Sequence, residues 1–269
     1  MGVCMNAIDI KNLSKTFVST RTGERVIALE NVNLSIPQGE FTAIVGPSGC
    51  GKSTLLSIMA GILAATEGQA VHFGETITGP APDRGVLFQD YALFPWLTVR
   101  QNIAFGPKAL GTPADSYEPE VDRLITVVGL EGFGDRLPHE LSGGMRQRCA
   151  LARMLANNPR TWLMDEPLAA VDLQTRTLLQ EEILRVWGED RPREDRPTIV
   201  FITHGIDEAV LLADRVVVLG RRPGRVKAEM IIDLPRPRFE HRDPAAEGRQ
   251  VQQIWDEIRE EARTAILED

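Results

Sequence analysis

The stretch GPSGCGKST, at residues 46–54, constrains the fold of this chain more than any other feature of its sequence. It matches the pattern G-x-x-x-x-G-K-[ST] and follows EFTAIVG, an apolar run typical of a buried strand. A helix is expected from Lys52 to about Ala60, just before Gly61. In such a unit the glycines let backbone N–H groups turn toward phosphate oxygens, and the start of the helix adds positive charge. The motif predicts an α/β fold built around a phosphate-binding loop.

The residues of this loop have distinct expected roles. The Lys52 side chain should reach the β- and γ-phosphates of a nucleotide, and the Ser53 hydroxyl should be a ligand of Mg²⁺. Because Cys50 lies inside the loop, alkylation of its thiol is expected to inhibit the protein and ATP to protect it. The alternative is a chance match in a glycine-rich turn, which the preceding strand argues against. The residues expected to contact ATP are Gly46, Pro47, Ser48, Gly49, Cys50, Gly51, Lys52, Ser53 and Thr54.

A second apolar strand, TWLMDEP at 161–167, ends in two carboxylates. Asp165 is expected to hold Mg²⁺ through water, and Glu166 to orient and deprotonate the attacking water. Side chains alternate along a strand, so the two carboxylates can point apart and perform different tasks. An acidic pair after a strand is more commonly a solvated turn or a helix cap. It becomes specific only beside a phosphate-binding loop.

Two further strands end in polar side chains. Gln89 ends RGVLFQ, and His204 ends TIVFITH. Ligands of parallel sheets bind at the C-terminal ends of the strands, so His204 is placed to contact a γ-phosphate or the water, and Gln89 to contact water or Mg²⁺. A lone histidine at a strand end is more commonly structural. Four strand ends with these side chains together predict hydrolysis of a triphosphate.

The stretch LSGGMRQR, at 141–148, has the form of a second anion site. Ser142 can cap a helix, and Gly143 and Gly144 let the backbone approach a phosphate. It falls in a helical region, away from the expected ligand edge of the sheet. It is either an ordinary capped helix or a site for the nucleotide of another chain. The second reading predicts a head-to-tail dimer that buries two ATP molecules.

The organisation along the chain follows from the apolar periodicity. Short strands precede the loop, residues 90–157 are helical in pattern, and strands alternate with helices from residue 161 onward. This order predicts an α/β P-loop fold with a mainly parallel core sheet, an N-terminal antiparallel β subdomain and a helical insertion. The expected domains are 6–235, with the insertion at about 90–157, and a helical C-terminal extension at 236–269. One face of the last helix is expected to pack on the domain through Val251, Ile254, Trp255 and Ile258.

Composition limits the partners and the compartment. The 269 residues carry a formal net charge of −8, which argues against nucleic acid as the main partner. The three cysteines, Cys4, Cys50 and Cys149, lack metal-ligand spacing and suggest a reducing compartment. No apolar run approaches the roughly 18 residues that span a bilayer, and the N-terminus lacks a signal-peptide pattern. We expect a cytoplasmic protein whose role at a membrane comes through a partner.

Together these motifs resemble the ATP-binding subunit of ABC transporters over about residues 6–235. The motifs GPSGCGKST, LSGGMRQR and LMDEP, with Gln89 and His204, stand in the family order. The resemblance implies that Phe17, in SKTF, stacks on adenine. It also implies that Asp172 is the D-loop carboxylate that contacts the partner protomer. The implied reaction is ATP hydrolysis with Mg²⁺.

The chain departs from the family pattern at three places. The D-loop reads LAAVD, at 168–172, where a GALD-like string is usual. Gly205 stands where an aspartate commonly follows the histidine, and Thr161 and Trp162 interrupt the usual aliphatic run. None of these changes removes a catalytic group. Gly205 and the D-loop change bear on communication between the two protomers and so on the rate of hydrolysis.

Within the family, RGVLFQDYALFPWLTVRQNIAFG at 84–106 is similar to importer subunits. In importers this region forms a groove for a helix of the transmembrane permease, which implies that Leu93, Phe94, Pro95 and Trp96 form an exposed apolar cluster. The motifs FPWLTVRQNIAFG, GPAPDRGVLFQ and VVVLGRRPGRV look most like the nitrate/sulfonate/taurine importer subfamily. That resemblance implies uptake of a small anion, an indirect link to a periplasmic or extracellular solute-binding protein, and a peripheral position on the inner face of the cell membrane.

Three other functions remain open at this point. An ABC ATPase of another importer class would share every catalytic motif. A non-transport ABC ATPase that remodels nucleic acid commonly has two cassettes or long coiled-coil insertions, which this acidic chain lacks. A P-loop kinase would need an acceptor pocket and would not release phosphate without an acceptor.

Overall fold

The computed structural model describes residues 5–169 and 171–268, with side chains described through residue 259. Cys4 and Asp269 lie outside the described residues. The strands are β1 (Asn6–Val18), β2 (Arg25–Pro37), β3 (Phe41–Val45), β4 (Glu67–His72), β5 (Glu75–Thr76), β6 (Arg84–Leu87), β7 (Thr161–Asp165), β8 (Thr198–Ile202), β9 (Arg215–Leu219) and β10 (Val226–Ile231). The helices are α1 (Lys52–Met59), α2 (Val99–Ala109), α3 (Ala114–Val127), η1 (Pro138–Glu140), α4 (Gly143–Leu155), α5 (Leu173–Trp187), η2 (Arg193–Asp195), α6 (Ile206–Leu212) and α7 (Pro244–Glu268).

The core sheet has six strands in the order β10-β9-β3-β8-β7-β6. Strands β9, β3, β8, β7 and β6 run parallel, and β10 pairs with β9 in the antiparallel sense. A second sheet, in the order β2-β1-β4-β5, is antiparallel. The expected α/β fold, with a mainly parallel core sheet and an antiparallel N-terminal sheet, is therefore confirmed.

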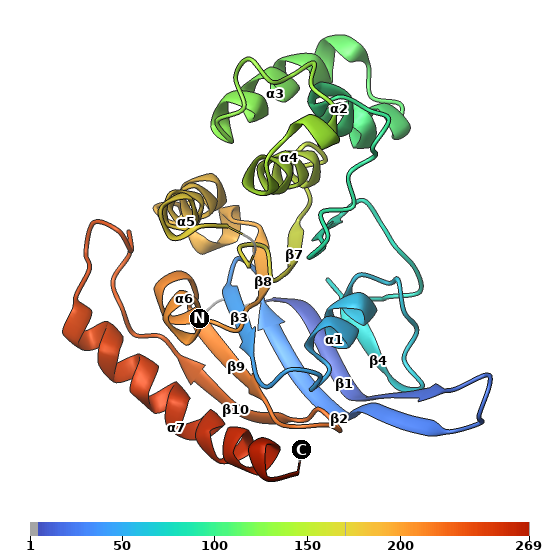
Figure 1. Ribbon diagram of the computed structural model, residues 1–269, viewed down its shortest axis with the longest axis vertical. Helices are drawn as coiled ribbons and strands as arrows, with labels where there is room; N and C mark the ends of the chain where they lie inside the picture. Colours follow the sequence, from blue (N-terminus) through green and yellow to red (C-terminus); the bar gives the residue numbers. More distant parts are fainter. Residues whose placement is uncertain (1–4, 170, 269) are drawn as a thin grey trace.

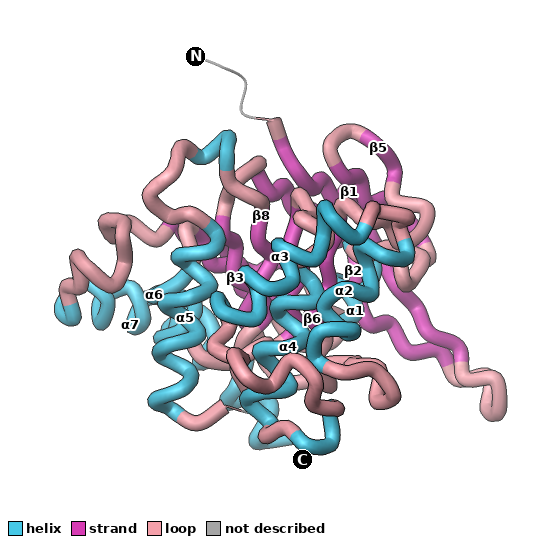
Figure 2. Tube along the Cα trace, turned by 90° about the horizontal axis from the view of Figure 1, so that it is seen from above, coloured by secondary structure: helices cyan, strands magenta, loops and turns pink. Residues whose placement is uncertain are grey.

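Side-chain alternation divides the core between the two faces of the six-stranded sheet. On β3, Phe41, Ala43 and Val45 pack on the face that α5 and α6 cover. Ile44 points to the other face, where Leu55 and other apolar residues of α1 are buried. The same apolar cluster contains residues of β1 and β2, so α1 lies between the two sheets. Figure 1 shows α1 beside β1 and β4, and Figure 2 shows the hairpin of β1 and β2 extending beyond the helices. The phosphate-binding loop is thus held between the core sheet and the antiparallel sheet.

Helices α2, α3 and α4 form the expected helical insertion as a lobe at one end of the molecule (Figure 1). Thr98 caps α2 in a capping box with Gln101, which fixes where the helix begins. Buried apolar residues of the three helices pack against one another and against the core sheet, among them Val99, Leu124 and Leu151. The lobe is therefore part of the main hydrophobic core.

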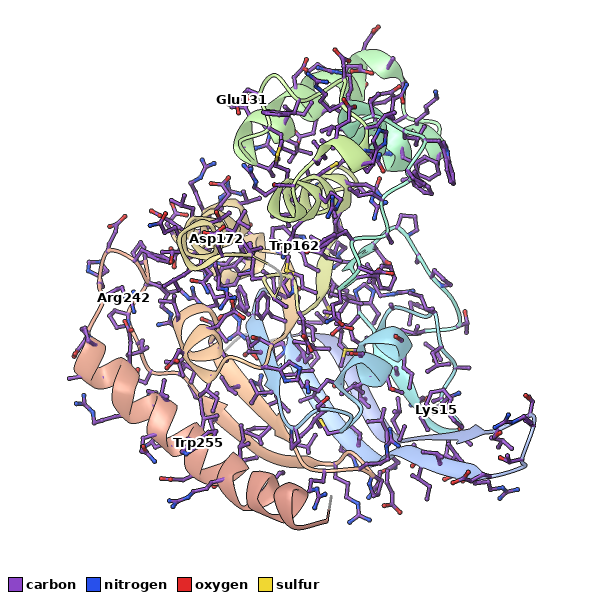
Figure 3. The ribbon with its side chains drawn as sticks, in the orientation of Figure 1. Lys15, Glu131, Trp162, Asp172, Arg242 and Trp255 are labelled. Carbon is purple, nitrogen blue, oxygen red and sulfur yellow. The ribbon has the colours of Figure 1, made fainter. Side chains whose placement is uncertain are left out.

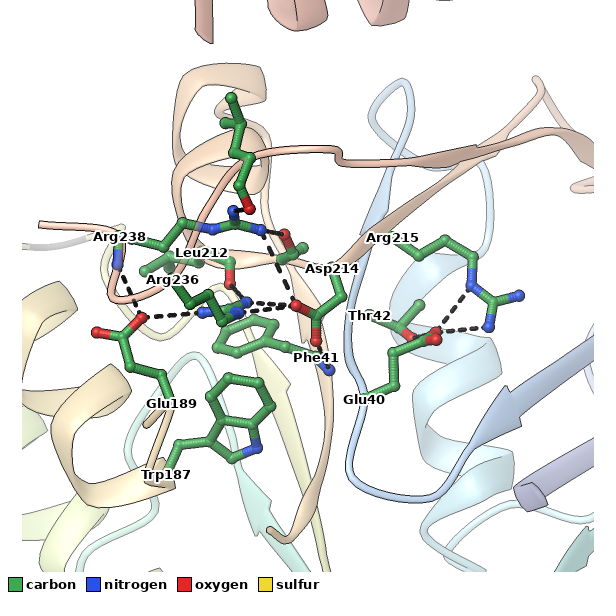
Figure 4. Close-up of polar contacts among 12 residues, drawn as sticks. Glu40, Phe41, Thr42, Trp187, Glu189, Leu212, Asp214, Arg215, Arg236 and Arg238 are labelled. Atoms are coloured by element: carbon green, nitrogen blue, oxygen red, sulfur yellow. Dashed lines mark hydrogen bonds and ion pairs between the residues drawn. The ribbon is translucent and has the colours of Figure 1, made fainter. Parts of the chain in front are cut away.

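Two arginines, Arg236 and Arg238, bind the segment before α7 to residues beside the core sheet (Figure 4). Arg236 contacts Asp214 at 2.8 Å and Glu189 at 3.1 Å, and its guanidinium lies 4.6 Å from the ring centroid of Trp187. Arg238 is 3% exposed and donates to the carbonyl of Ala213. Burial, together with the charge of the neighbouring Arg236, lowers the pKa of Arg238 to about 10. These contacts tie residues 236–238 to the end of α5 and the start of β9.

Helix α7 packs on the core through only part of its expected apolar face. Ile254 is fully buried and Ile258 is 8% exposed, as expected. Trp255 is 46% exposed, so its assignment to the buried face is wrong (Figure 3). The buried stripe of α7 is centred on Ile254 and Ile258, so Trp255, about 100° around the helix from Ile254, lies at its exposed edge.

Of the helices built from the described residues, none combines the length and the apolar character that crossing a membrane requires.

Candidate functional site

A cleft of about 360 Å³ lies where the phosphate-binding loop meets the ends of the neighbouring strands. Residues from the N-terminal sheet, the loop, the region after β6, the end of β7 and the end of β8 line it together. This is the edge at which a parallel sheet binds its ligands. The lining residues are Phe17, Ala28, Ser48, Gly49, Gly51, Lys52, Ser53, Thr54, Gln89, Glu166, His204 and Arg222.

Two glycines of the loop occupy positions that no other residue could fill without displacing a neighbour. Gly51 has φ 104°, and a Cβ there would lie 2.7 Å from Cδ2 of Leu29. Gly46 has φ 154°, and a Cβ there would lie 2.4 Å from the carbonyl oxygen of Leu219. The loop can therefore pass between β2 and β9 only with glycine at both positions.

Lys52 and Ser53 begin α1 and point to different partners. The ammonium group of Lys52 donates to the carbonyl oxygens of Gly46 at 2.8 Å and Pro47 at 2.9 Å, so the lysine side chain lies along the loop. The hydroxyl of Ser53 donates to Oδ1 of Asp165 at 3.1 Å. Two of the three residues expected at Mg²⁺, Ser53 and Asp165, therefore lie within hydrogen-bond distance of each other.

The donor set fits a Mg²⁺ ion that phosphate and water also coordinate. Ser53, Asp165 and the nearby Gln89 offer hard oxygen atoms, which this ion prefers. Among the described residues, no cluster of three or more His, Cys, Asp or Glu side chains could hold a metal by itself. Burial raises the pKa of Asp165, and the hydrogen bond from Ser53 opposes this shift.

Glu166 and His204 form a direct contact across two neighbouring strands. Oε1 of Glu166 lies 2.6 Å from Nε2 of His204, and Asp165 pairs in register with Ile202. Glu166 has φ 49°, which is uncommon for a residue other than glycine, and its N–H donates to the carbonyl of Ile202. This turn of the backbone after β7 places the carboxylate of Glu166 in the cleft, next to the imidazole.

Gln89 and Phe17 lie where the sequence places them. The side chain of Gln89 is exposed in the turn after β6, and it lines the cleft. Phe17 is 42% exposed on β1, and the ammonium group of Lys15 lies 5.2 Å from its ring centroid. An exposed aromatic ring in a cleft lined by the phosphate-binding loop is suited to stacking on a base.

Cys50 does not present its thiol to the cleft, which corrects the expected sensitivity to alkylation. Its side chain is 1% exposed and belongs to the apolar cluster around α1. Burial raises the pKa of the Cys50 thiol, and the nearby Lys52 only partly opposes this. Since the thiolate is the reactive form, Cys50 should react slowly with thiol reagents even without ATP. Any contact of Cys50 with a nucleotide would be made by its backbone.

Ser142, Gly143, Gly144 and Asp172 do not line this cleft. Ser142 caps α4 by accepting from the N–H of Met145 at 3.2 Å. Asp172 caps α5, and the hydrogen bond from the N–H of Thr175 lowers the pKa of its carboxyl group. A Cβ on Gly144 would lie 3.9 Å from Val171 and from Thr175, so the start of α4 adjoins the start of α5. Helix α4 belongs to the helical lobe, apart from α1 (Figure 1), while Figure 3 places Asp172 at α5.

Sequence reasoning missed two features of the site. Arg222 lines the cleft from the loop between β9 and β10, and no local pattern marks it as a ligand contact. Thr203 and Glu208, on either side of His204, share a hydrogen bond. They stand five positions apart, whereas the partners of a capping box stand three apart, so no local pattern marks this pair.

An exposed aromatic surface lies on the helical lobe. Trp96 is 71% exposed, and Phe105 is 43% exposed. The Phe94 ring centroid lies 5.7 Å from that of Trp96 and 4.3 Å from that of Phe105. Leu93 instead packs partly against the core. Of the expected cluster, Pro95 and Trp96 are therefore exposed, while Leu93 and Phe94 are partly buried.

The loop, the Asp165–Glu166 pair and His204, at the ends of parallel strands, define a P-loop nucleoside triphosphatase. The family model described as ABC transporter matches residues 29–169. The chain belongs to the ABC transporter family.

Three curated relatives are similar to this chain over most of its length. An uncharacterized ABC transporter ATP-binding protein of Methanocaldococcus jannaschii is 50% identical over 86% of this chain and 84% of its own. The taurine import ATP-binding protein of Roseobacter denitrificans is 48% identical, covering 84% and 82%. The nitrate import ATP-binding protein of Synechocystis sp. is 45% identical, covering 85% and 83%.

Among solved structures, a dimeric ATP-binding cassette in a post-hydrolysis state with ADP and phosphate is similar to this chain. The TM-score is 0.72 at 31% identity, covering 84% of this chain and 98% of that chain.

Proposed function

We propose that this chain is the ATP-hydrolysing motor subunit of an ABC importer. The observation that carries the proposal is the contact of 2.6 Å between Glu166 and His204 over a cleft lined by the phosphate-binding loop. This arrangement supplies a carboxylate base and an imidazole beside the place where phosphates would bind. Hydrolysis of a triphosphate needs positioning and charge neutralisation more than covalent catalysis, and these groups supply both.

Each residue around the cleft has a role in this proposal. Phe17 stacks on the adenine, and the backbone N–H groups that the loop at 46–54 has at every residue except Pro47 hold the phosphates together with Lys52. Glu166 accepts a proton from the attacking water, and His204 holds that carboxylate and contacts the γ-phosphate. Ser53, Asp165 and Gln89 hold Mg²⁺, which neutralises phosphate charge when bound.

A head-to-tail dimer would complete the site. Ser142, Gly143 and Gly144 lie away from the cleft of their own chain, and their backbone forms the start of α4. Such a helix start binds anions, so in a dimer it would close over the ATP of the partner, and Asp172 beside it would contact the partner protomer. The similarity to a dimeric cassette with ADP and phosphate supports this arrangement.

The aromatic surface around Trp96 is the proposed contact with a transmembrane permease subunit. Trp96 is a large exposed side chain on the helical lobe, and Phe94 and Phe105 extend the apolar area beside it. Through this contact the chain would sit on the cytoplasmic face of the membrane. A solute-binding protein outside the membrane would act on the same complex indirectly.

The proposed solute is a small anion such as taurine, another sulfonate or nitrate. Relatives named for taurine import and for nitrate import, each matched over more than four fifths of this chain, support that class. The test is growth of the source cells lacking this chain, with taurine, an alkanesulfonate or nitrate as the sole sulfur or nitrogen source. Sulfate and ammonium are the controls.

Failure on one of these sources is the expected result, with rescue by the intact chain and no rescue by Glu166→Gln. Such a pattern would establish both the motor role and the solute. Normal growth on all three sources would contradict the proposed solute class. In that case ATP hydrolysis by the purified chain would still test its role as an ATPase. The chain would then be assigned to an importer of another solute class.

A further inference from the structure

We propose that Glu208 is a positioning residue that holds His204 against Glu166. This inference rests on the proposed ATPase function. Among the described residues, the hydrogen bonds of Glu208 go to Gln180 and Thr203 and not to Glu166 or the phosphate-binding loop, although Glu208 and Glu166 line one pocket. It acts on the backbone on both sides of His204, through the side chain of Thr203.

A chain of hydrogen bonds carries this inference. Nε2 of Gln180, on α5, donates to Oε1 of Glu208 at 2.9 Å. The Thr203 hydroxyl donates to Oε2 of Glu208 and accepts from the N–H of Gly205 at 3.0 Å. The N–H of Thr203 itself donates to the carbonyl of Ile44 on β3 at 3.3 Å. The residues before and after His204 are therefore fixed by one hydroxyl, which one carboxylate orients.

The first turn of α6 explains why the hydrogen bonds of Thr203 and Glu208 are needed. Gly205 is the N-cap of α6, and it has no side chain to cap the helix. In an ordinary capping box, a glutamate at the third helical position accepts from the N–H of the N-cap residue. Here Glu208 has that position, but the N–H of Gly205 donates to the Thr203 hydroxyl instead. That hydroxyl in turn donates to the carboxylate of Glu208. Glu208 thus restrains a glycine that would otherwise leave the turn after His204 loose.

The residues that bond to Glu208 are buried, whereas His204 is not. Thr203 is 4% exposed and Gln180 is 7% exposed, while the imidazole of His204 is 49% exposed. His204 itself therefore has few packing contacts that could fix its position. Its orientation toward Glu166 depends on the backbone turn that the buried pair of Thr203 and Gln180 holds through Glu208.

The experiment compares ATP turnover by four forms of the full-length chain: wild type, Glu208→Ala, Glu208→Gln and Asp207→Ala. Glu208→Ala removes the acceptor for both partners, so kcat should fall about 10-fold with KM for ATP changed less than about twofold. Glu208→Gln keeps an oxygen for Thr203, and its amide can donate to Gln180 once the Gln180 amide turns over. It should therefore restore kcat to within about twofold of wild type. Asp207→Ala, on the exposed side of the same helix turn, is the matched control and should match wild type.

A double-mutant cycle with Thr203→Val separates positioning from general loss of stability. If Thr203 and Glu208 act as one chain of contacts, the double variant should lose no more kcat than the more impaired single variant. Thermal unfolding of each variant checks that the chain is folded at the assay temperature.

Three results would overturn the inference: Glu208→Ala with wild-type kcat, Glu208→Gln as slow as Glu208→Ala, or losses of kcat that add in the double variant. No ATP turnover by the wild type would instead contradict the proposed function itself.

Discussion

Nε2 of His204 and Oε1 of Glu166 lie 2.6 Å apart, although the two residues are separated by 37 intervening positions in the sequence. Strands β7 and β8 are neighbours in the core sheet, and their parallel register brings the two strand ends side by side. A carboxylate that must accept a proton from water is thereby oriented by an imidazole from the next strand. The predictions below begin from this pair.

Glu166→Gln should keep ATP binding and lose turnover. Glutamine retains the shape of the side chain but cannot accept a proton, so kcat should fall by about 100-fold or more. The dissociation constant for ATP should change less than about twofold, because the loop that holds the phosphates is untouched. Steady-state phosphate release and equilibrium binding of a labelled ATP check both parts. Normal turnover would remove Glu166 as the base.

The combined change of Ser142→Ala and Gly143→Asp should block hydrolysis without weakening binding of ATP to the isolated protomer. The new carboxylate would face the phosphates of a partner chain, where like charges repel. ATP-driven dimerisation, followed by light scattering, should be lost together with turnover. Weaker binding of ATP at protein concentrations too low for dimers would mean that this motif acts within one chain.

Arg236→Ala should destabilise the fold by about 3 kcal/mol, because it removes the cation paired with the largely buried Glu189 and the nearer of the two arginines paired with Asp214. Arg123→Ala is the matched control, since Arg123 pairs with Glu120 on an exposed helix surface. Its cost should stay at or below about 1 kcal/mol. Urea unfolding of the three proteins measures the difference. Equal losses for Arg236 and Arg123 would contradict the role assigned to the network in Figure 4.

Protonation of His72 should destabilise the fold in mild acid. His72 is 3% exposed and lies 2.9 Å from the Thr161 hydroxyl and 3.2 Å from Asp83. Burial lowers its pKa to about 4, although the charge of Asp83 acts in the opposite direction. Between about pH 6.5 and pH 4 the unfolded chain therefore binds a proton that the folded chain does not. The contribution of His72 to stability is complete above pH 6.5 and is lost as the pH falls toward 4, by about 3 kcal/mol.

The measurement for His72 is the free energy of unfolding at pH 7 and at pH 4.5. Wild type should lose more stability between these values than His72→Gln, whose side chain does not titrate. His241→Gln, at an exposed position, should behave as wild type. A wild-type loss equal to that of His72→Gln would show that the groups responsible lie elsewhere.

The sequence predicts those parts of the site in which a short motif directly follows the apolar run of a strand. The loop at 46–54, the carboxylates at the end of β7 and His204 at the end of β8 each follow an apolar run, so the strand and its end are visible without the fold. The parallel sheet then brings the strand ends together. This is why the cleft contains Lys52, Gln89, Glu166 and His204, as expected.

The parts that could not be predicted depend on the direction of a side chain or on contacts between distant segments. A motif shows that Cys50 lies in the loop, but only packing shows that its thiol faces the apolar cluster. Arg222 and the contact between Gln180 and Glu208 join elements that no local pattern relates. Helical periodicity predicted the burial of Ile254 and failed for Trp255, its neighbour in sequence.

The loop that passes between β2 and β9 also limits how this protein can vary in evolution. Gly51 adjoins Leu29 of β2, Gly46 adjoins Leu219 of β9, and a Cβ on Gly224 would lie 2.0 Å from the carbonyl oxygen of Cys50. A bulkier residue at position 29 would meet the loop at Gly51, where the Leu29 side chain already leaves no room for a Cβ. Substitutions that look remote and purely structural in β2 should therefore be selected against for their effect on nucleotide affinity. Sequence changes in the N-terminal sheet would then alter the fitness of the cell through the affinity of this chain for its nucleotide.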